Sequence, residues 1–295
     1  MTRQAKFLAY LGGTALLILS LVYVGASIIR NWGSVEQARL HSIPWLLAAM
    51  AIYAISHLTT GLSWPLAIRQ LGQRISVRDG LRIGLVAQIG KYLPGNIAHY
   101  AGRGVLAKRL GIPLRVSGIA TAIELGSALT AAMLLAAAGL LLDPRTLAWL
   151  PPISTSSAAI LMAATIALAA MAVWLLRKGS HPALLAAPTL CLAASFGLSS
   201  LSVCALAYAL GFAPIPVPVA IGAFSLAWAA GFVVPGAPAG IGVREATLLA
   251  LLSPIIGTGP AVTVAIAHRL VTAAVDALAA LVGYGWLASG PLAKK

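Results

Sequence analysis

Six apolar runs constrain this chain most, because each is long enough to cross a lipid bilayer as a helix. They cover residues 7–29, 43–67, 116–142, 158–176, 184–210 and 260–287. Hydrophobic residues occupy 60% of the 295 positions and charged residues only 9%. This composition argues against a soluble protein with a cofactor in its core. We therefore predict an all-α integral membrane protein whose residues 1–295 form a single polytopic domain.

Two further apolar regions are interrupted by Pro-Gly and predict re-entrant helical hairpins. They pair residues 79–93 with 96–109 around Pro94-Gly95, and 217–234 with 239–252 around Pro235-Gly236. Most of these segments are too short to span a bilayer. Because a backbone break at membrane depth needs protein or a water-filled cavity around it, we expect both breaks to face the interior of the protein.

The two hairpins share one sequence skeleton. Gly90, Pro94, Gly95 and Arg103 recur as Gly231, Pro235, Gly236 and Arg244, each 141 positions later (244 − 103). The span after each hairpin also matches, with Glu124 in the place of Arg269. Three full spans separate the hairpins, so the hairpins enter from opposite sides. We predict an inverted repeat, with repeat 1 at about 43–142 and repeat 2 at about 184–288, and such paired interruptions mark transporter binding sites.

The formal charge of +14 follows membrane topology. If the N-terminus is cytoplasmic, thirteen Lys and Arg residues lie on the cytoplasmic side and three lie outside. This bias is the positive-inside pattern, and it predicts a multi-pass protein of the bacterial inner membrane with both termini cytoplasmic. Because the basic residues lie in short loops between spans, we do not expect a nucleic-acid partner.

Charged residues at membrane depth are costly and therefore indicate function. The predicted helices contain seven of them: Lys91, Arg103, Glu124, Arg244, Glu245, Arg269 and Asp276. Four are basic and three acidic, so the interior is slightly positive and suits an anionic ligand. We expect Glu124, Glu245, Arg269 and Asp276 to form exchangeable pairs that act as gates.

The hairpins themselves predict the ligand contacts. Asn96 suits the start of a helix, on which His99 and Arg103 then share a face. Gly240 and Gly242 leave backbone N–H groups accessible at the second break. A helix N-terminus and an arginine both bind phosphate well. The predicted substrate-binding residues are Lys91, Asn96, His99, Arg103, Gly240, Arg244 and Gly242.

A purely structural interpretation stays open. Arg103 or Arg244 would then pair with Glu124, and Arg269 with Asp276, only to hold the helices together. No catalytic or metal-binding motif is present in the sequence, so we expect neither an enzyme, a metal nor a cofactor.

Two motifs resemble a known family. GKYLPGNIAHYAGR, from Gly90 to Arg103, and PGAPAGIGVREA, from Pro235 to Ala246, are similar to the flippase-like transmembrane domain of bacterial lysylphosphatidylglycerol synthases. The resemblance extends over about residues 43–287. One departure is Pro235-Gly-Ala-Pro-Ala-Gly240, where the family has PGG before its glycine-rich turn.

In the synthases this domain moves an aminoacylated lipid between leaflets, and a separate soluble domain makes that lipid. The present chain ends at Lys295, so the resemblance implies translocation of an anionic membrane lipid without aminoacyl transfer. The family does not fix the lipid. Two alternatives are a scaffold for a lipid- or glycan-modifying enzyme and a membrane-embedded lipid-phosphate transferase.

Overall fold

A computed structural model describes residues 39–92, 98–142, 183–234 and 240–288, with single positions between 22 and 33. Within these ranges the regular structure is helical throughout. Four described helices are long and apolar enough to cross a membrane: α3 (Ile43–Gln70), α6 (Leu114–Leu141), α9 (Ala183–Ala209) and α12 (Thr258–Ala288). They fall on four of the six predicted spans. The predicted spans at 7–29 and 158–176 lie outside the described residues.

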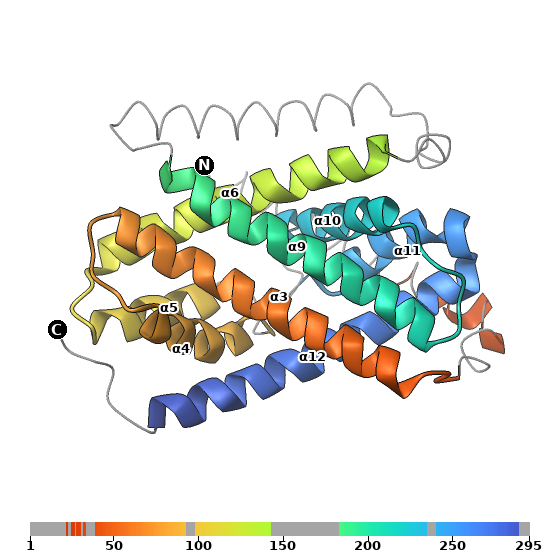
Figure 1. Ribbon diagram of the computed structural model, residues 1–295, viewed down its shortest axis with the longest axis horizontal. Helices are drawn as coiled ribbons and strands as arrows, with labels where there is room; N and C mark the ends of the chain where they lie inside the picture. The colour runs from red at the N-terminus through yellow and green to blue at the C-terminus, as the bar shows by residue number, and fades with distance from the viewer. Residues whose placement is uncertain are drawn as a thin grey trace.

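Helices α3 and α9 cross the bundle side by side and in opposite directions (Figure 1). The N–H groups of His41 and Ser42, just before α3, donate to the carbonyl of Ala209 at the end of α9, at 2.8 and 3.2 Å. Farther along, the Ser202 hydroxyl donates to the Ala49 carbonyl at 2.8 Å. Small hydroxylated residues thus let the two backbones approach closely, as in many membrane helix pairs.

Two pairs of shorter helices occupy the positions of the predicted hairpins. The first comprises α4 (Val77–Gln88), the 3-10 turn η1 (Ile89–Tyr92) and α5 (Ala98–Lys108), and the second comprises α10 (Val217–Val233) and α11 (Val243–Ile256). The two pairs lie toward opposite ends of the bundle (Figure 1). Pro94, Gly95, Asn96, Pro235 and Gly236 lie outside the described residues. Re-entry of either pair into a membrane therefore stays a prediction.

The packing of these pairs interlocks the two halves of the chain. Helix α4 packs on α12, and α10 packs on α6. In each case a glycine of the long helix allows close contact: Gly283 lies against Leu85 and Val86, and Gly139 lies against the backbone of Gly222. Each long helix thus contacts a short helix from the other half, which is the exchange expected of two intertwined repeats. The repeat boundaries stay a prediction.

Helix α11 starts four residues later than the predicted segment, which began at residue 239. Gly240 and Gly242 precede it at φ of 70° and 84°, a conformation that favours glycine. The Gly242 N–H donates to Oε2 of Glu245 at 2.6 Å. Contrary to our expectation, the Gly242 N–H is therefore occupied within the protein and is not an accessible donor.

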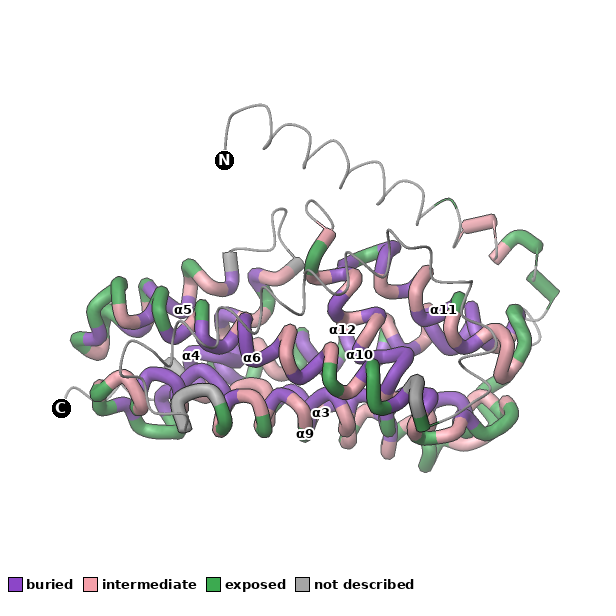
Figure 2. The backbone as a smooth tube through the Cα atoms, turned by 90° about the horizontal axis from the view of Figure 1, so that it is seen from above, coloured by how far each residue is buried: buried purple, intermediate pink, exposed green. Residues whose placement is uncertain are grey.

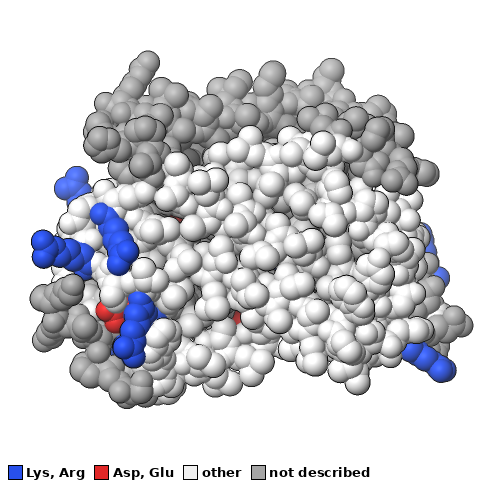
Figure 3. Space-filling view, viewed as in Figure 1, with Lys and Arg blue, Asp and Glu red and all other residues white. Residues whose placement is uncertain are grey.

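The surface has the character of a membrane protein. Between its two ends, the face in Figure 3 is almost free of charge, and Lys and Arg gather where α4 and α5 lie. Exposed basic residues at that end are Arg69, Arg74, Arg78, Lys108, Arg109 and Arg115. Large apolar side chains on the long helices, such as Leu134, Leu270 and Leu281, are about two-thirds exposed (63%, 67% and 69%), and the buried positions face inward (Figure 2).

Candidate functional site

A cavity of about 140 Å³ lies inside the bundle, between the two pairs of short helices. A space of this size accommodates several water molecules or a small polar group. Eight of the predicted site residues line it: Lys91, His99, Arg103, Glu124, Gly240, Arg244, Arg269 and Asp276. Glu245 lies behind them, against Arg269. The tertiary fold thus brings together charges from both predicted hairpins and from the spans that follow them.

Arg103 is held firmly within the protein. Its Nη1 is 2.5 Å from Oε2 of Glu124 on α6, and its Nη2 donates to Oε1 of Gln88 at 3.3 Å. Ser63 of α3 donates to the other carboxylate oxygen of Glu124 at 2.6 Å. Arg103 and Glu124 are 3% and 5% exposed, so the pair is buried, although Nε of Arg103 has no hydrogen-bond partner among the described residues. This geometry matches the structural interpretation of Arg103.

Asp276 is the centre of a second polar cluster. This aspartate of α12 is 0% exposed, and its Oδ2 lies 2.6 Å from Nζ of Lys91. Its Oδ1 lies 3.1 Å from Nδ1 of His57 and accepts a hydrogen bond from the Tyr53 hydroxyl at 3.3 Å. The Lys91 ammonium, which the sequence places at the first break, therefore reaches the interior rather than the membrane interface.

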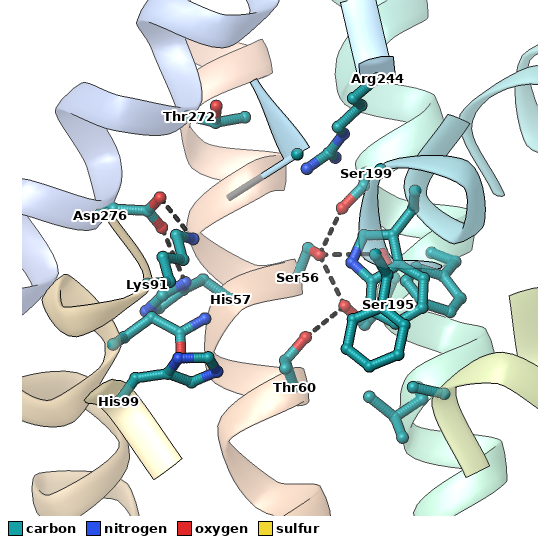
Figure 4. A pocket seen from close by; sticks show the side chains of 18 of the residues that line it. Ser56, His57, Thr60, Lys91, His99, Ser195, Ser199, Arg244, Thr272 and Asp276 are labelled. Atoms are coloured by element: carbon teal, nitrogen blue, oxygen red, sulfur yellow. Dashed lines mark hydrogen bonds and ion pairs between the residues drawn. The ribbon is translucent and has the colours of Figure 1, made fainter. Parts of the chain in front are cut away.

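Arg269 and Arg244 differ in their surroundings. Nε of Arg269 lies 3.6 Å from Oε1 of Glu245, so Arg269 has a carboxylate partner. Arg244 extends from α11 into the cavity (Figure 4), and its guanidinium lies over the Phe224 ring, 4.6 Å from the ring centre. In the part of the chain that the structure describes, no carboxylate lies within ion-pair distance of Arg244.

The charges of the site do not cancel. Four cations (Lys91, Arg103, Arg244 and Arg269) surround or face the cavity, against three carboxylates (Glu124, Glu245 and Asp276). With the histidines neutral, the sum is +1. Three of the cations lie within ion-pair distance of a carboxylate, whereas Glu245 and Asp276 attract Arg244 only from a greater distance. An anion in the cavity would complete the charge balance, and an arginine is well suited to bind phosphate oxygens.

A polar stripe on α3 is the main feature that our sequence reasoning missed. It consists of Tyr53, Ser56, His57, Thr60 and Ser63, all on one helical face of an apolar span, and all but Ser63 line the cavity. A single histidine such as His57 on an apolar span does not by itself indicate a site. The spacing of three and four residues between the polar side chains would have revealed the stripe.

No group of three or more His, Cys, Asp and Glu side chains with metal-binding geometry occurs among the described residues. The predicted contacts at Asn96 and at the two Pro-Gly breaks lie outside those residues.

The fold and the cavity define an all-helical, multi-pass membrane protein with a polar interior. The chain belongs to the lysylphosphatidylglycerol synthase TM region family, whose model matches residues 7–181. The family resemblance is therefore confirmed, over a stretch that contains the motif at Gly90–Arg103 and Glu124. The motif at Pro235–Ala246 lies beyond the matched residues. No curated protein matches the chain.

Proposed function

We propose that this protein translocates an anionic lipid head group across the bacterial inner membrane through the cavity. The observation that carries the proposal is the net charge of +1 around a cavity that both pairs of short helices line, together with Arg244, which has no carboxylate at ion-pair distance in the described chain. A cation inside the bundle without a carboxylate at ion-pair distance is costly, and a phosphate oxygen would supply the missing interaction. Membership of a family tied to lipid chemistry supports the proposal.

The orientation of the proposed transport path follows from the basic residues at one end of the bundle. By the positive-inside rule, the basic end with α4 and α5 would be cytoplasmic, and the proposed topology has both termini in the cytoplasm. The two pairs of short helices would enter the membrane from opposite sides and meet at the cavity. The ion pairs Lys91–Asp276 and Arg269–Glu245 would exchange partners as the head group passes, while one half of the bundle rocks against the other.

Leaflet exchange in liposomes tests this proposal. We would reconstitute the purified protein and follow the inward movement of fluorescent phosphatidylglycerol, comparing wild type, Arg244→Gln and Arg109→Gln. Arg109 is an exposed arginine between α5 and α6 and serves as the matched control. Hydrogen bonds to charged groups contribute about 1.5–3 kcal/mol. We therefore expect Arg244→Gln to slow exchange by about tenfold or more, and Arg109→Gln to leave it unchanged.

Wild-type exchange rates in the Arg244→Gln protein would reject this site. An absence of exchange for every lipid, together with co-purification of a lipid-modifying enzyme, would favour the scaffold alternative. Formation of a modified lipid by the purified protein would favour the transferase.

A further inference from the structure

Four hydroxyl groups form a connected wall of the cavity, across from the Lys91–Asp276 pair (Figure 4). Ser56 and Thr60 come from α3, and Ser195 and Ser199 come from α9. Oγ of Ser56 lies 2.9 Å from Oγ of Ser195 and 2.7 Å from Oγ of Ser199. Oγ1 of Thr60 lies 2.6 Å from Oγ of Ser195.

A count of the hydroxyl protons assigns the donor and the acceptor in each hydrogen bond of this wall. Each hydroxyl has one proton to donate and two lone pairs to accept. In the arrangement that satisfies all four contacts at once, Ser56 donates to the Ser195 carbonyl at 2.8 Å, and Ser195 and Ser199 donate to Ser56. Ser195 has then used its proton, so Thr60 donates to Ser195. All four protons are committed, and the lone pairs of Thr60 and Ser199 remain. The wall therefore offers acceptors, and it suits a ligand group that donates.

A second, independent observation indicates a ligand in the same cavity. His99 is only 6% exposed and lines the cavity, and its Nδ1 has no hydrogen-bond partner among the described residues. A buried polar atom without a partner is costly. A hydroxyl group satisfies this atom in either tautomer, because a hydroxyl both donates and accepts. An ammonium group only donates.

The charge balance decides whether the donating group of the ligand is a hydroxyl or an ammonium. A ligand with one phosphodiester and no other charge would bring the summed charge of the cavity from +1 to zero. An ammonium on the same head group would leave the cavity at +1, with a cation close to Arg244 and Lys91. Hydroxyl donors bring no such penalty.

We infer that the head group is a phosphodiester of an uncharged, hydroxylated alcohol, with its phosphate at Arg244 and its hydroxyls at the wall formed by Ser56, Thr60, Ser195 and Ser199. This inference rests on the proposed function for its setting, and it names the substrate class of that site. Glycerol and a sugar share the recognised chemistry.

Binding to the purified protein tests the inference independently of transport. Three lipids with the same acyl chains would compete for the protein in detergent: phosphatidylglycerol, phosphatidylethanol and phosphatidylethanolamine. The first two have equal charge, but only phosphatidylglycerol has free hydroxyls. One neutral hydrogen bond predicts about two- to tenfold tighter binding of phosphatidylglycerol than of phosphatidylethanol. Phosphatidylethanolamine should bind most weakly.

Substitutions in the wall test whether its hydroxyls cause the preference for phosphatidylglycerol. Thr60→Val removes a wall hydroxyl and keeps the shape of the side chain, so the preference for phosphatidylglycerol should shrink by about threefold. Thr60→Ser should retain it. Thr59→Val is the matched control, because the Thr59 hydroxyl bonds to the Ile55 carbonyl of its own helix and lies outside the cavity.

Separate outcomes bear on the two proposals. Equal affinity of the wild type for phosphatidylglycerol and phosphatidylethanol, tightest binding of phosphatidylethanolamine, or an unchanged preference in Thr60→Val would each overturn the inference. The wild-type comparison stands even if a variant fails to fold. Selective binding without leaflet exchange would uphold the head-group inference and contradict translocation. A soluble glycerol phosphate and a soluble sugar phosphate would each compete with phosphatidylglycerol for the protein. Effective competition would show that the isolated head group is recognised, and its absence would show that the protein requires the lipid.

Discussion

Arg103 and Arg244 occupy the same position in the two matching motifs, yet the fold treats them in opposite ways. Arg103 is paired with Glu124 and hydrogen-bonded to Gln88. Arg244 lies over an aromatic ring, and no carboxylate of the described chain lies within ion-pair distance of it. The cause lies in the following span, where the counterpart of Glu124 is Arg269. This exchange of sign leaves Arg244 without the carboxylate that pairs with Arg103 in the first motif.

This difference separates the two roles that the sequence analysis left open. The structural interpretation fits Arg103, whose charge the protein already neutralises. The ligand interpretation fits Arg244, which has no carboxylate at ion-pair distance in the described chain. We therefore propose that the head-group phosphate binds at Arg244 and that the Arg103–Glu124 pair has a structural role.

Glu124→Gln should give the largest effect, because it leaves the buried Arg103 without its counter-charge. Removing one partner of a buried pair costs about 3–5 kcal/mol. We expect a clear fall in the thermal unfolding midpoint in detergent, and Arg103→Met in the Glu124→Gln background should recover most of it. Arg244→Gln should leave the midpoint unchanged or raise it. Equal losses in Glu124→Gln and Arg244→Gln would remove the distinction between the two arginines.

The second contrast concerns His99 and Gly240, which also match at the 141-residue spacing (240 − 99). His99 lies in the first turn of α5, whereas Gly240 has φ of 70° and an added Cβ would lie 3.0 Å from Cα of Gly231. A side chain in this conformation costs about 1–2 kcal/mol. Gly240→Ala should therefore lower the unfolding midpoint more than His99→Ala does. Similar midpoints for the two variants would show that the second turn does not need glycine.

The sequence predicted much of this arrangement. Long apolar runs located α3, α6, α9 and α12, because length and hydropathy alone decide whether a helix can span a bilayer. The cost of charge in a membrane identified Lys91, Arg103, Arg244 and Asp276, since such residues must face an interior. Their meeting in one cavity follows from that requirement.

The pairing of those charges could not be predicted. Glu245 directly follows Arg244 but pairs with Arg269, and Glu124 pairs with Arg103, which lies 21 positions earlier (124 − 103), so only the packing of α6 and α12 decides which arginine each one reaches. Asp276 pairs with Lys91, which lies 185 positions earlier (276 − 91), and no local pattern encodes that contact. The predicted start of α11 was also wrong, because Gly240 and Gly242 adopt positive φ instead of extending the helix.

Arg269→Gln should give the smallest effect, and it tests the charge argument most directly. Loss of this cation leaves Glu245 uncompensated and brings the sum of the site from +1 to zero, while Arg244 itself is retained. One distant unit charge contributes about 1 kcal/mol in a protein interior, so phosphatidylglycerol affinity should fall by about fivefold. Glu245→Gln added to Arg269→Gln restores +1 and should restore affinity. If the single and double variants bind equally, the local geometry of Arg244, and not the net charge of the cavity, controls recognition of the anion.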